Sequence, residues 1–392
     1  MAVMRRAGRG ATACVRSAAV LLALGCLAGG LALGPQAWAS KSDTPVLDPS
    51  EIQPGRTISI LGVGDILTHR EIIDQALADS GRRSPDFYEQ LKGVQSLVSS
   101  ADLAVCHLEF PMGSTKGPWT AWPDLPAGPP QLAKAVAKVG FDSCSTVSNH
   151  AFDQGFLGLS RVLNALDKSG VAHAGTARTE EEASTPTIVD VKGVPVALLA
   201  YSFSFNGMPV PAGREWSANL IDVKRIIKEA EHARRLGARL VVLSLHAGYE
   251  GDANPSSQQL DVVREVAASG MVDLVLGHHA HVVQPVDRVD GMWVAYGHGN
   301  LLSAQSRRDP RSGDGLATMF TFTEQEDGSF EATGANGYVV HNADFPFRLS
   351  LVPRRGAATD AEAGSWSRTE GAVLDFRADR WGFRLLRWGK TT

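Results

Sequence analysis

An α/β fold with largely parallel connections is the fold class that the sequence predicts, and two observations predict it. Apolar runs typical of buried strands recur from residue 57 onward. Segments of ten to sixteen residues with helical spacing of apolar positions separate most of these runs. No stretch of the sequence repeats another. Strands that alternate with helices of this length are typical of β-α-β units, in which the strands lie parallel.

Local signals place the individual elements. Gly140 and Gly170 each end a segment of helical spacing, because glycine adopts the left-handed conformation that closes a helix. The dipeptide Lys192–Gly193 is a turn between two strand runs, and residues 118–130 form a loop rich in Pro, Gly and Trp. In chain order, strands are predicted at 57–65, 101–109, 141–150, 184–191, 194–203, 238–246, 271–279, 291–300 and 316–324, and helices at 71–80, 87–98, 131–139, 158–169, 222–237 and 258–269.

The first 39 residues have the pattern of a secretory signal peptide. Four arginines precede an apolar run of about sixteen residues, and the small-x-small pattern Ala-Trp-Ala stands before Ser40. A membrane anchor is the alternative, although such a run is short for a span of roughly twenty residues. A lipid anchor on Cys26 is a second alternative. We therefore expect a secreted or cell-surface protein, cleaved near Ala39.

The remaining chain is acidic and divides into three parts. Without the signal segment it carries 34 basic and 42 acidic side chains, a net charge near −8, which argues against a nucleic-acid partner. Residues 40–55 are expected to be an extended lead-in, residues 56–341 the main domain, and residues 342–392 an appended or wrapping segment. Cys106 and Cys144 both lie in predicted strands, either as a disulfide or as two buried thiols.

Polar side chains gather where the predicted strands end. Eight of the eleven histidines lie within a few positions of such ends, and ligands of open α/β sheets bind at the carboxyl ends of the strands. Imidazole, carboxylate and amide groups together suit Zn²⁺, Mn²⁺ or Fe²⁺. The sequence therefore predicts one or two divalent metal ions, or acid/base chemistry, at this edge. The residues are Asp65, Glu109, Asn149, His246 and His279.

A series of motifs resembles the CapA family, which is linked to poly-γ-glutamate capsule synthesis and related to calcineurin-like metallophosphoesterases. The motifs are VGDILTH, HLEFPM, SNHAFDQG, LHAGYEG, GHHAHVVQPV and AYGHGN, in this order over roughly residues 57–303. The resemblance implies two β-sheets packed as a sandwich flanked by helices, an α-β-β-α architecture. It also implies a two-metal site at the strand ends.

The resemblance also implies individual roles. Glu109 resembles the carboxylate that bridges two metal ions, and His150 resembles the histidine that donates a proton. His69 is an additional candidate ligand, whereas His278 is expected to support the ligands from behind. The implied metal ligands are Asp65, His69, Glu109, Asn149, His246, His279 and His281.

Several positions depart from the family pattern, and two of them stand beside implied ligands. His107 stands where the family usually has Asn, and Ser148 replaces the first of two Asn. Glu250, Gln259 and the loop around Trp122 are candidates to line the cleft, with ordinary surface or core packing as the alternative.

The sequence is compatible with three functions. The first is an exported, metal-dependent hydrolase in which activated water attacks a phosphoester, or an amide or ester of a cell-envelope polymer. The second is a non-enzymatic factor for capsule synthesis or export, with membrane partners. The third is a metal-free acid/base enzyme that uses Glu109 and histidine. We expect both His279 and His281 to face one cleft from an extended segment, on which residues two apart point the same way.

Overall fold

The structure is a computed structural model that describes residues 52–305 and 309–389. The predicted signal peptide and most of the lead-in lie outside the described residues. Among the described helices, none is long and apolar enough to cross a membrane.

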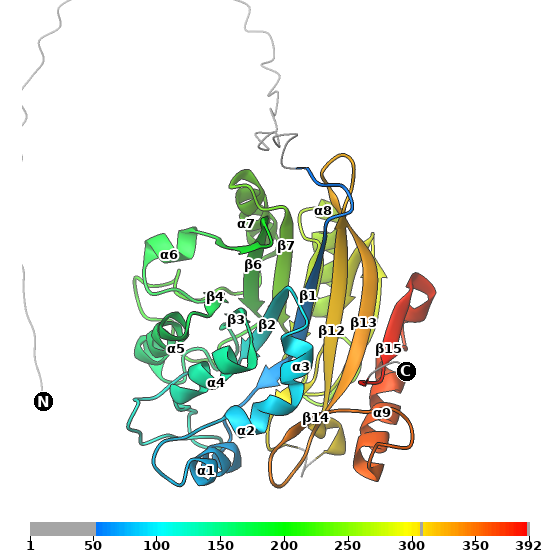
Figure 1. Cartoon of the computed structure of the whole chain (residues 1–392). Coiled ribbons are helices and arrows are strands. Elements are labelled where there is room, and N and C mark those ends of the chain that lie inside the picture. The colour runs from blue at the N-terminus through cyan, green and yellow to red at the C-terminus, as the bar shows by residue number, and fades with distance from the viewer. Residues whose placement is uncertain (1–51, 306–308, 390–392) are drawn as a thin grey trace, which may run out of the picture. The chain divides into compact units, whose positions relative to one another are not determined.

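The first of two sheets is mixed and has nine strands (Figure 1). Its β1–β4 half is parallel, and β12, β13 and β14 extend it in antiparallel fashion from β1. The strands pair in the order β14 (Leu349–Leu351), β13 (Phe330–Asn342), β12 (Asp314–Glu324), β1 (Thr57–Ile66), β2 (Leu103–Leu108), β3 (Ser143–Ser145) and β4 (Ala172–Ala174), with β11 (Asn300–Leu302) beside β1 and β15 (Phe383–Leu386) beside β13.

The second sheet has six strands and a parallel centre. Strands β6, β7, β8 and β10 run parallel, while β5 and β9 pair antiparallel at the two edges. The Lys192–Gly193 turn closes the β5–β6 hairpin with positive φ values of 53° and 78°, as a two-residue hairpin turn requires. The order is β5 (Thr187–Val191), β6 (Val194–Ser202), β7 (Leu240–His246), β8 (Leu274–His278), β10 (Met292–Ala295) and β9 (Val286–Val289).

The main core lies between the two sheets. Ile60 of β1 and Phe320 of β12 pack in one cluster with Leu198 of β6 and Leu276 of β8. Gly62 permits this approach, because a Cβ there would lie 2.5 Å from a Leu276 side-chain carbon. The α-β-β-α sandwich expected from the family resemblance is therefore confirmed.

Helices cover the outer faces of both sheets. One cluster packs α1–α5 against the first sheet, and another packs α7 and α8 against the second. The helices are α1 (Arg70–Asp79), α2 (Tyr88–Leu91), α3 (Gln95–Val98), α4 (Gln131–Val139), α5 (Gly155–Ser169), α6 (Glu180–Ser184), α7 (Val223–Arg235), α8 (Ser257–Ser269) and α9 (Asp360–Val373), with short 3₁₀ turns at η2 (Lys92–Val94), η3 (Pro310–Gly313) and η4 (Ala378–Trp381).

The single helix predicted at 87–98 is wrong in detail. The segment forms α2, η2 and α3 in succession. Gly93 lies at the break, where an added Cβ would lie 1.7 Å from the carbonyl oxygen of Leu349 in β14. A close tertiary contact therefore overrides continuous helical spacing.

The segment after Asn342 contributes to the first sheet. Strand β14 pairs with β13 in antiparallel fashion, and β15 pairs with the same strand in parallel. Between them, α9 packs Trp366 against Val339 and Val352.

Cys106 and Cys144 are direct partners in β2 and β3 and form a disulfide. Of the two alternatives for these cysteines, the structure therefore contains the disulfide and not two buried thiols.

Candidate metal centre

Side chains from both sheets meet where the parallel strands end. Asp65 is the last residue but one of β1, Glu109 directly follows β2, and His246 is the last residue of β7. Asn149 lies four residues beyond β3, which is shorter than predicted, and His279 follows β8. All five side chains are almost completely buried. Two sheets thus supply one cluster.

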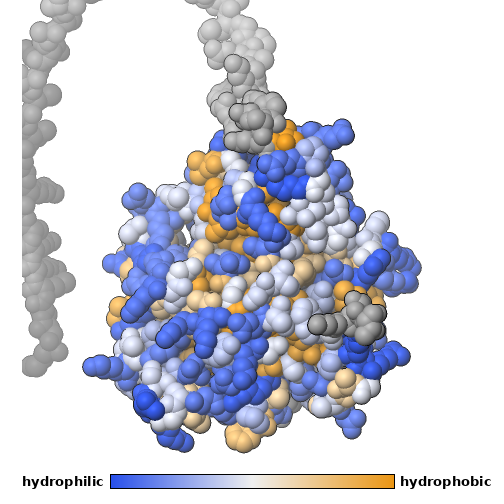
Figure 2. All heavy atoms as spheres, viewed as in Figure 1, coloured by the Kyte–Doolittle hydropathy of each residue, from blue (hydrophilic) through white to orange (hydrophobic). Residues whose placement is uncertain are grey.

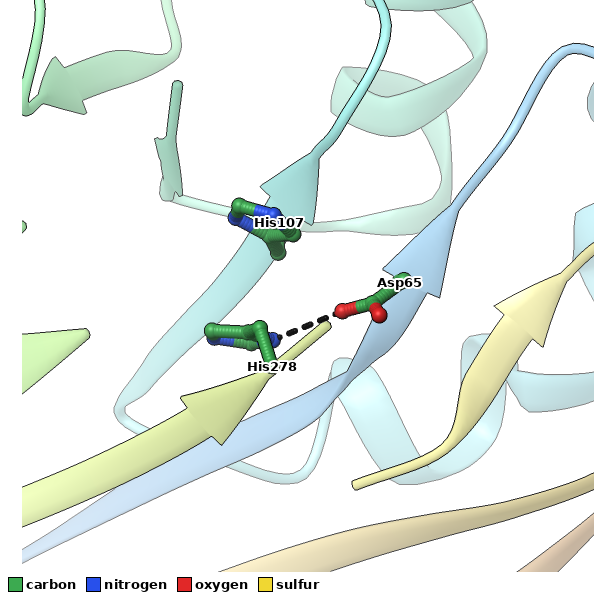
Figure 3. Close-up of side chains that lie close together, drawn as sticks. All are labelled: Asp65, His107 and His278. Carbon is green, nitrogen blue, oxygen red and sulfur yellow. Dashed lines mark hydrogen bonds and ion pairs between the residues drawn. The ribbon is translucent and has the colours of Figure 1, made fainter. Parts of the chain in front are cut away.

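Asp65 accepts hydrogen bonds from neighbouring residues, and Figure 3 shows the one from His278. Its Oδ1 accepts a hydrogen bond of 3.0 Å from Nδ1 of His278, and its Oδ2 accepts one of 3.0 Å from the backbone N–H of His279. Nδ1 of His281 lies 3.3 Å from the same Oδ2. Burial raises the pKa of Asp65, but the hydrogen bonds from the two histidines outweigh it and hold the pKa well below its usual range.

Glu109 lies between two histidines. Its Oε1 is 3.5 Å from Nε2 of His281 and 3.9 Å from Nε2 of His150. Burial raises the pKa of Glu109. Nδ1 of His281 donates to Oδ1 of Asn300 at 3.0 Å, which directs the Nε2 atom of His281 toward Glu109.

His246 and Asn149 form a second corner of the cluster. Nε2 of His246 is hydrogen-bonded to Oδ1 of Asn149 at 2.8 Å. The rings of His246 and His279 have centroids 4.8 Å apart. Burial lowers the pKa of His279 to about 3 and that of His246 well below its usual range, so both rings are neutral at pH 7, as metal ligands must be.

Several buried polar atoms of this cluster have no hydrogen-bond partner among the described residues. Buried polar groups are nearly always paired, and leaving one unpaired costs about 1–3 kcal/mol. Atoms of Glu109, His279 and His281 lie within 4.8 Å of one another and could hold one metal ion. The donor set therefore fits divalent metal. The unpartnered atoms are Oε1 and Oε2 of Glu109, Nδ1 of His246, Nδ1 of His279, Nε2 of His278 and Nε2 of His107.

His107 and His278 lie behind Asp65. Together the three residues offer atoms within 4.8 Å of one another, but the two rings are stacked, with centroids 4.2 Å apart and planes at 18° (Figure 3). Stacked imidazoles direct their in-plane lone pairs side by side and not toward one point. We therefore assign the pair to the support of Asp65, in which His278 orients the carboxylate.

The prediction of an extended segment at His279 and His281 is wrong. Strand β8 ends at His278, and the next residues have φ values of 92° at His279 and 55° at His281. This left-handed backbone is rare for residues other than glycine. It turns the chain so that both imidazoles still line one cavity, and such strain is typical of functional sites.

A cavity of about 630 Å³ opens above the cluster. His279, His281 and Asn149 form part of its lining, and Phe110, Phe203, Trp122 and Glu250 form part of its walls. The Trp122 side chain is 57% exposed. The predicted cleft position of Gln259 is wrong, because its side chain is buried in a capping box with Ser256 at the start of α8.

His150 lines the cavity beside Glu109. Its Nδ1 donates to Oδ2 of Asp153 at 2.5 Å. Burial lowers the pKa of His150, but the hydrogen bond to Asp153 and the charge of Glu109 outweigh it, so the pKa is raised. His69, the additional candidate ligand, precedes α1 on the cavity wall, and its Nδ1 accepts a hydrogen bond from the backbone of Ala304 at 3.2 Å.

A family model described as bacterial capsule synthesis protein PGA_cap matches residues 59–305, more than half of the chain. The chain belongs to this family. It is similar to the PGA biosynthesis protein CapA of Bacillus subtilis, with 24% identity over 76% of this chain and 75% of that protein. It is also similar to the capsule biosynthesis protein CapA of Bacillus anthracis, with 26% identity over 45% of this chain and 43% of that protein.

Two solved structures are similar to this member of the capsule synthesis family. The NAD nucleotidase of Haemophilus influenzae has a TM-score of 0.46 and 11% identity, over 86% of this chain and 65% of that one. The 5′-nucleotidase of Candida albicans has a TM-score of 0.40 and 12% identity, over 81% of this chain and 59% of that one.

Two residues of this family member were missed as functional candidates. Asn300 accepts from His281 and donates to the backbone carbonyl of the same residue, which fixes the strained loop. Asp153 orients His150. Both stand inside the quoted motifs, Asn300 in AYGHGN and Asp153 in SNHAFDQG, so an accompanying polar residue in each motif was the available signal.

Proposed function

We propose that the protein is an exported, metal-dependent hydrolase that acts in capsule or cell-envelope polymer metabolism. The observation that carries this proposal is the set of buried, unpartnered ligand atoms beside one cavity. Asp65, Glu109, Asn149, His246, His279 and His281 would hold one or two divalent ions. When bound, such ions supply Lewis acidity and bring the pKa of water toward 7.

The chain's own residues would position the substrate and move the proton. Phe110 and Phe203 would form apolar walls beside the substrate, because both line the cavity. Water attacks a phosphoester, or an amide or ester, and the bond to the leaving group breaks. Asp153 holds His150, and the raised pKa of this imidazole favours its protonated form. Its Nε2 would donate that proton to the leaving oxygen or nitrogen.

The test of this proposal combines elemental analysis with turnover. Purified protein from metal-supplemented medium is assayed on a panel of phosphoester and γ-glutamyl substrates, with and without a chelator. We expect bound metal, turnover that the chelator abolishes, and a fall of about 10²–10⁴-fold in His150→Ala, the usual contribution of a general acid. Protein without metal, or turnover that the chelator leaves intact, would contradict the proposal.

A non-enzymatic role in capsule synthesis or export is a second candidate, with membrane components as partners. The observation that favours it is His107, which packs a buried ring against His278 where the family pattern has Asn. Bound metal without turnover on the whole panel would support this role. Export itself is tested by N-terminal sequencing of secreted protein, which should begin near Ser40.

A further inference from the structure

A second hollow lies between α4 and α5, lined by residues distinct from those of the metal-site cavity. It has a volume of about 810 Å³ and includes Ser114 and Thr115 from the loop that follows β2. The same loop, further along, places Trp122 in the wall of the metal-site cavity. The α4–α5 groove and that cavity therefore share one connecting loop.

The charged residues lining the α4–α5 groove are all basic. They are Lys134 on α4, with Arg161 and Lys168 on α5. None of the three has an ion pair with a described residue. Helix α4 carries no acidic residue, and the one acid of α5, Asp167, pairs with Arg178 and His173. A local positive field thus persists on a chain with a net negative charge.

The positive surface continues past α4. A neighbouring hollow of about 370 Å³ shares Gln131 and Lys134 with the α4–α5 groove and adds Arg83 and Lys138. Asp86 is the single acid in that lining. Five cations, taken from α4, α5 and the segment after α1, therefore line two hollows that share Gln131 and Lys134. Charges distributed over two adjoining hollows fit an extended ligand better than a single ion.

Gln131 adds a second requirement for the ligand. Its Nε2 donates to the carbonyl of Thr115 at 2.9 Å and to the hydroxyl of Ser84 at 3.1 Å. Its Oε1 is buried without a hydrogen-bond partner in the described part of the chain. A matching ligand offers an N–H or O–H donor. The groove lining holds no aromatic side chain among the described residues, which leaves nothing on which nucleobases would stack.

We propose that the α4–α5 groove binds a linear polymer whose repeating units carry carboxylates and N–H or O–H donors. Exposed ammonium groups bind one anion weakly in water. Several cationic groups that contact the same polymer bind it more tightly than one group does, because each contact after the first is intramolecular. This binding needs neither metal nor turnover, and so it stands apart from the proposed hydrolysis.

The experiment measures binding of fluorescent poly-L-glutamate to purified protein treated with a chelator. Wild type should bind the polymer and not free glutamate, with affinity that falls as salt rises. The variant Lys134→Gln/Arg161→Gln/Lys168→Gln should bind at least about tenfold more weakly and lower the logarithmic salt slope by about two, since each neutralised contact contributes roughly 0.7 to the slope. The matched control, Lys224→Gln/Lys228→Gln/Arg235→Gln on α7, removes the same charge elsewhere and should bind as wild type does.

Three outcomes would overturn the proposal. They are no polymer binding by wild type at low salt, equal binding by the groove variant and wild type, and equal losses in the groove variant and the α7 control. Polyphosphate and oligothymidylate serve as further probes. Tighter binding of either one than of poly-L-glutamate would also overturn it, because polyphosphate lacks the donors and oligothymidylate adds bases. Circular dichroism confirms that each variant is folded.

Discussion

The two ends of the sandwich treat buried charge in opposite ways. At the end where the parallel strands finish, Glu109 and His279 have buried atoms with no hydrogen-bond partner among the residues that the structure describes. At the end where the strands begin, Glu324 is buried between two arginines, 2.8 Å from Nε of Arg56 and 2.8 Å from an Nη of Arg239. Glu324 is thus paired within the chain, whereas the buried atoms of Glu109 and His279 are not paired with any described residue.

Other charges at the starting end are paired in the same manner. Asp102, directly before β2, accepts from the backbone and hydroxyl of Ser59 and lies beside Lys192. Asp273, directly before β8, accepts from Arg234 and from the backbone of Val241, each at 2.6 Å. These hydrogen bonds connect the start of β2 to β1 and the start of β8 to β7. The difference teaches that charged groups pair with one another at one end, whereas the buried groups at the other end have atoms available for the metal ions that we propose.

The largest effect is expected at the end without partners. His279→Ala should abolish most metal binding and any turnover, because it removes one ligand from the proposed set. The protein should stay folded, since the imidazole lies at a strand end and not in the apolar core. Metal per chain by mass spectrometry is the measurement, with circular dichroism as the control. Equal metal content in folded wild type and variant would contradict the proposed role of His279 as a metal ligand.

The opposite end should respond in stability alone. Glu324→Gln should lower the free energy of unfolding by about 3 kcal/mol, because it leaves Arg56 and Arg239 without their buried partner. Metal content should remain that of the wild type. Denaturant unfolding gives the first quantity and mass spectrometry the second. A variant that loses metal and keeps its stability would reverse the proposed division between the two ends.

His278→Ala tests the support of the ligands. It should weaken metal binding by about 10–100-fold, a smaller loss than for His279→Ala, because it removes the hydrogen bond that orients Asp65. The measurement is a metal titration of chelator-treated protein. His278→Asn, whose side-chain amide can donate to Asp65, should recover part of the loss. A loss as complete as that of His279→Ala would make His278 a ligand.

The smallest effect concerns pH at the paired end. Burial raises the pKa of Asp102, but Lys192 and Ser59 outweigh it and lower the pKa. Because the folded-state pKa is lower than the unfolded value near 4, the ionised carboxylate stabilises the fold at pH values above 4. This stabilisation is lost as the pH falls through the folded-state pKa. Asp102→Asn should thus cost about 1 kcal/mol at pH 7, and this cost should shrink as the pH falls below about 4 through the folded-state pKa. Unfolding curves over this range measure it, and a difference that persists at low pH would point to another cause.

The sequence predicted the strand ends well and their surroundings less well. Asp65, Glu109 and His246 follow apolar runs, which local periodicity reveals directly. The left-handed turns at His279 and His281 depend on Asn300, far along the chain, and no local pattern encodes them. The break at Gly93 likewise depends on a contact with β14. The role of Gln259 was missed because a capping glutamine and a cleft glutamine have the same sequence signal.

The disulfide between Cys106 and Cys144 fixes the register of β3 against β2, and thereby the position of Asn149 in the candidate metal centre. Strands β2 and β3 share only three paired positions, and the disulfide joins the middle pair. A slip of β3 by two residues along β2 would move the following loop by about 7 Å, at roughly 3.3 Å per residue. Asn149 would then leave His246, which it now contacts at 2.8 Å. A covalent link between partners forbids this slip, so the position of the amide is set by chemistry as well as by packing.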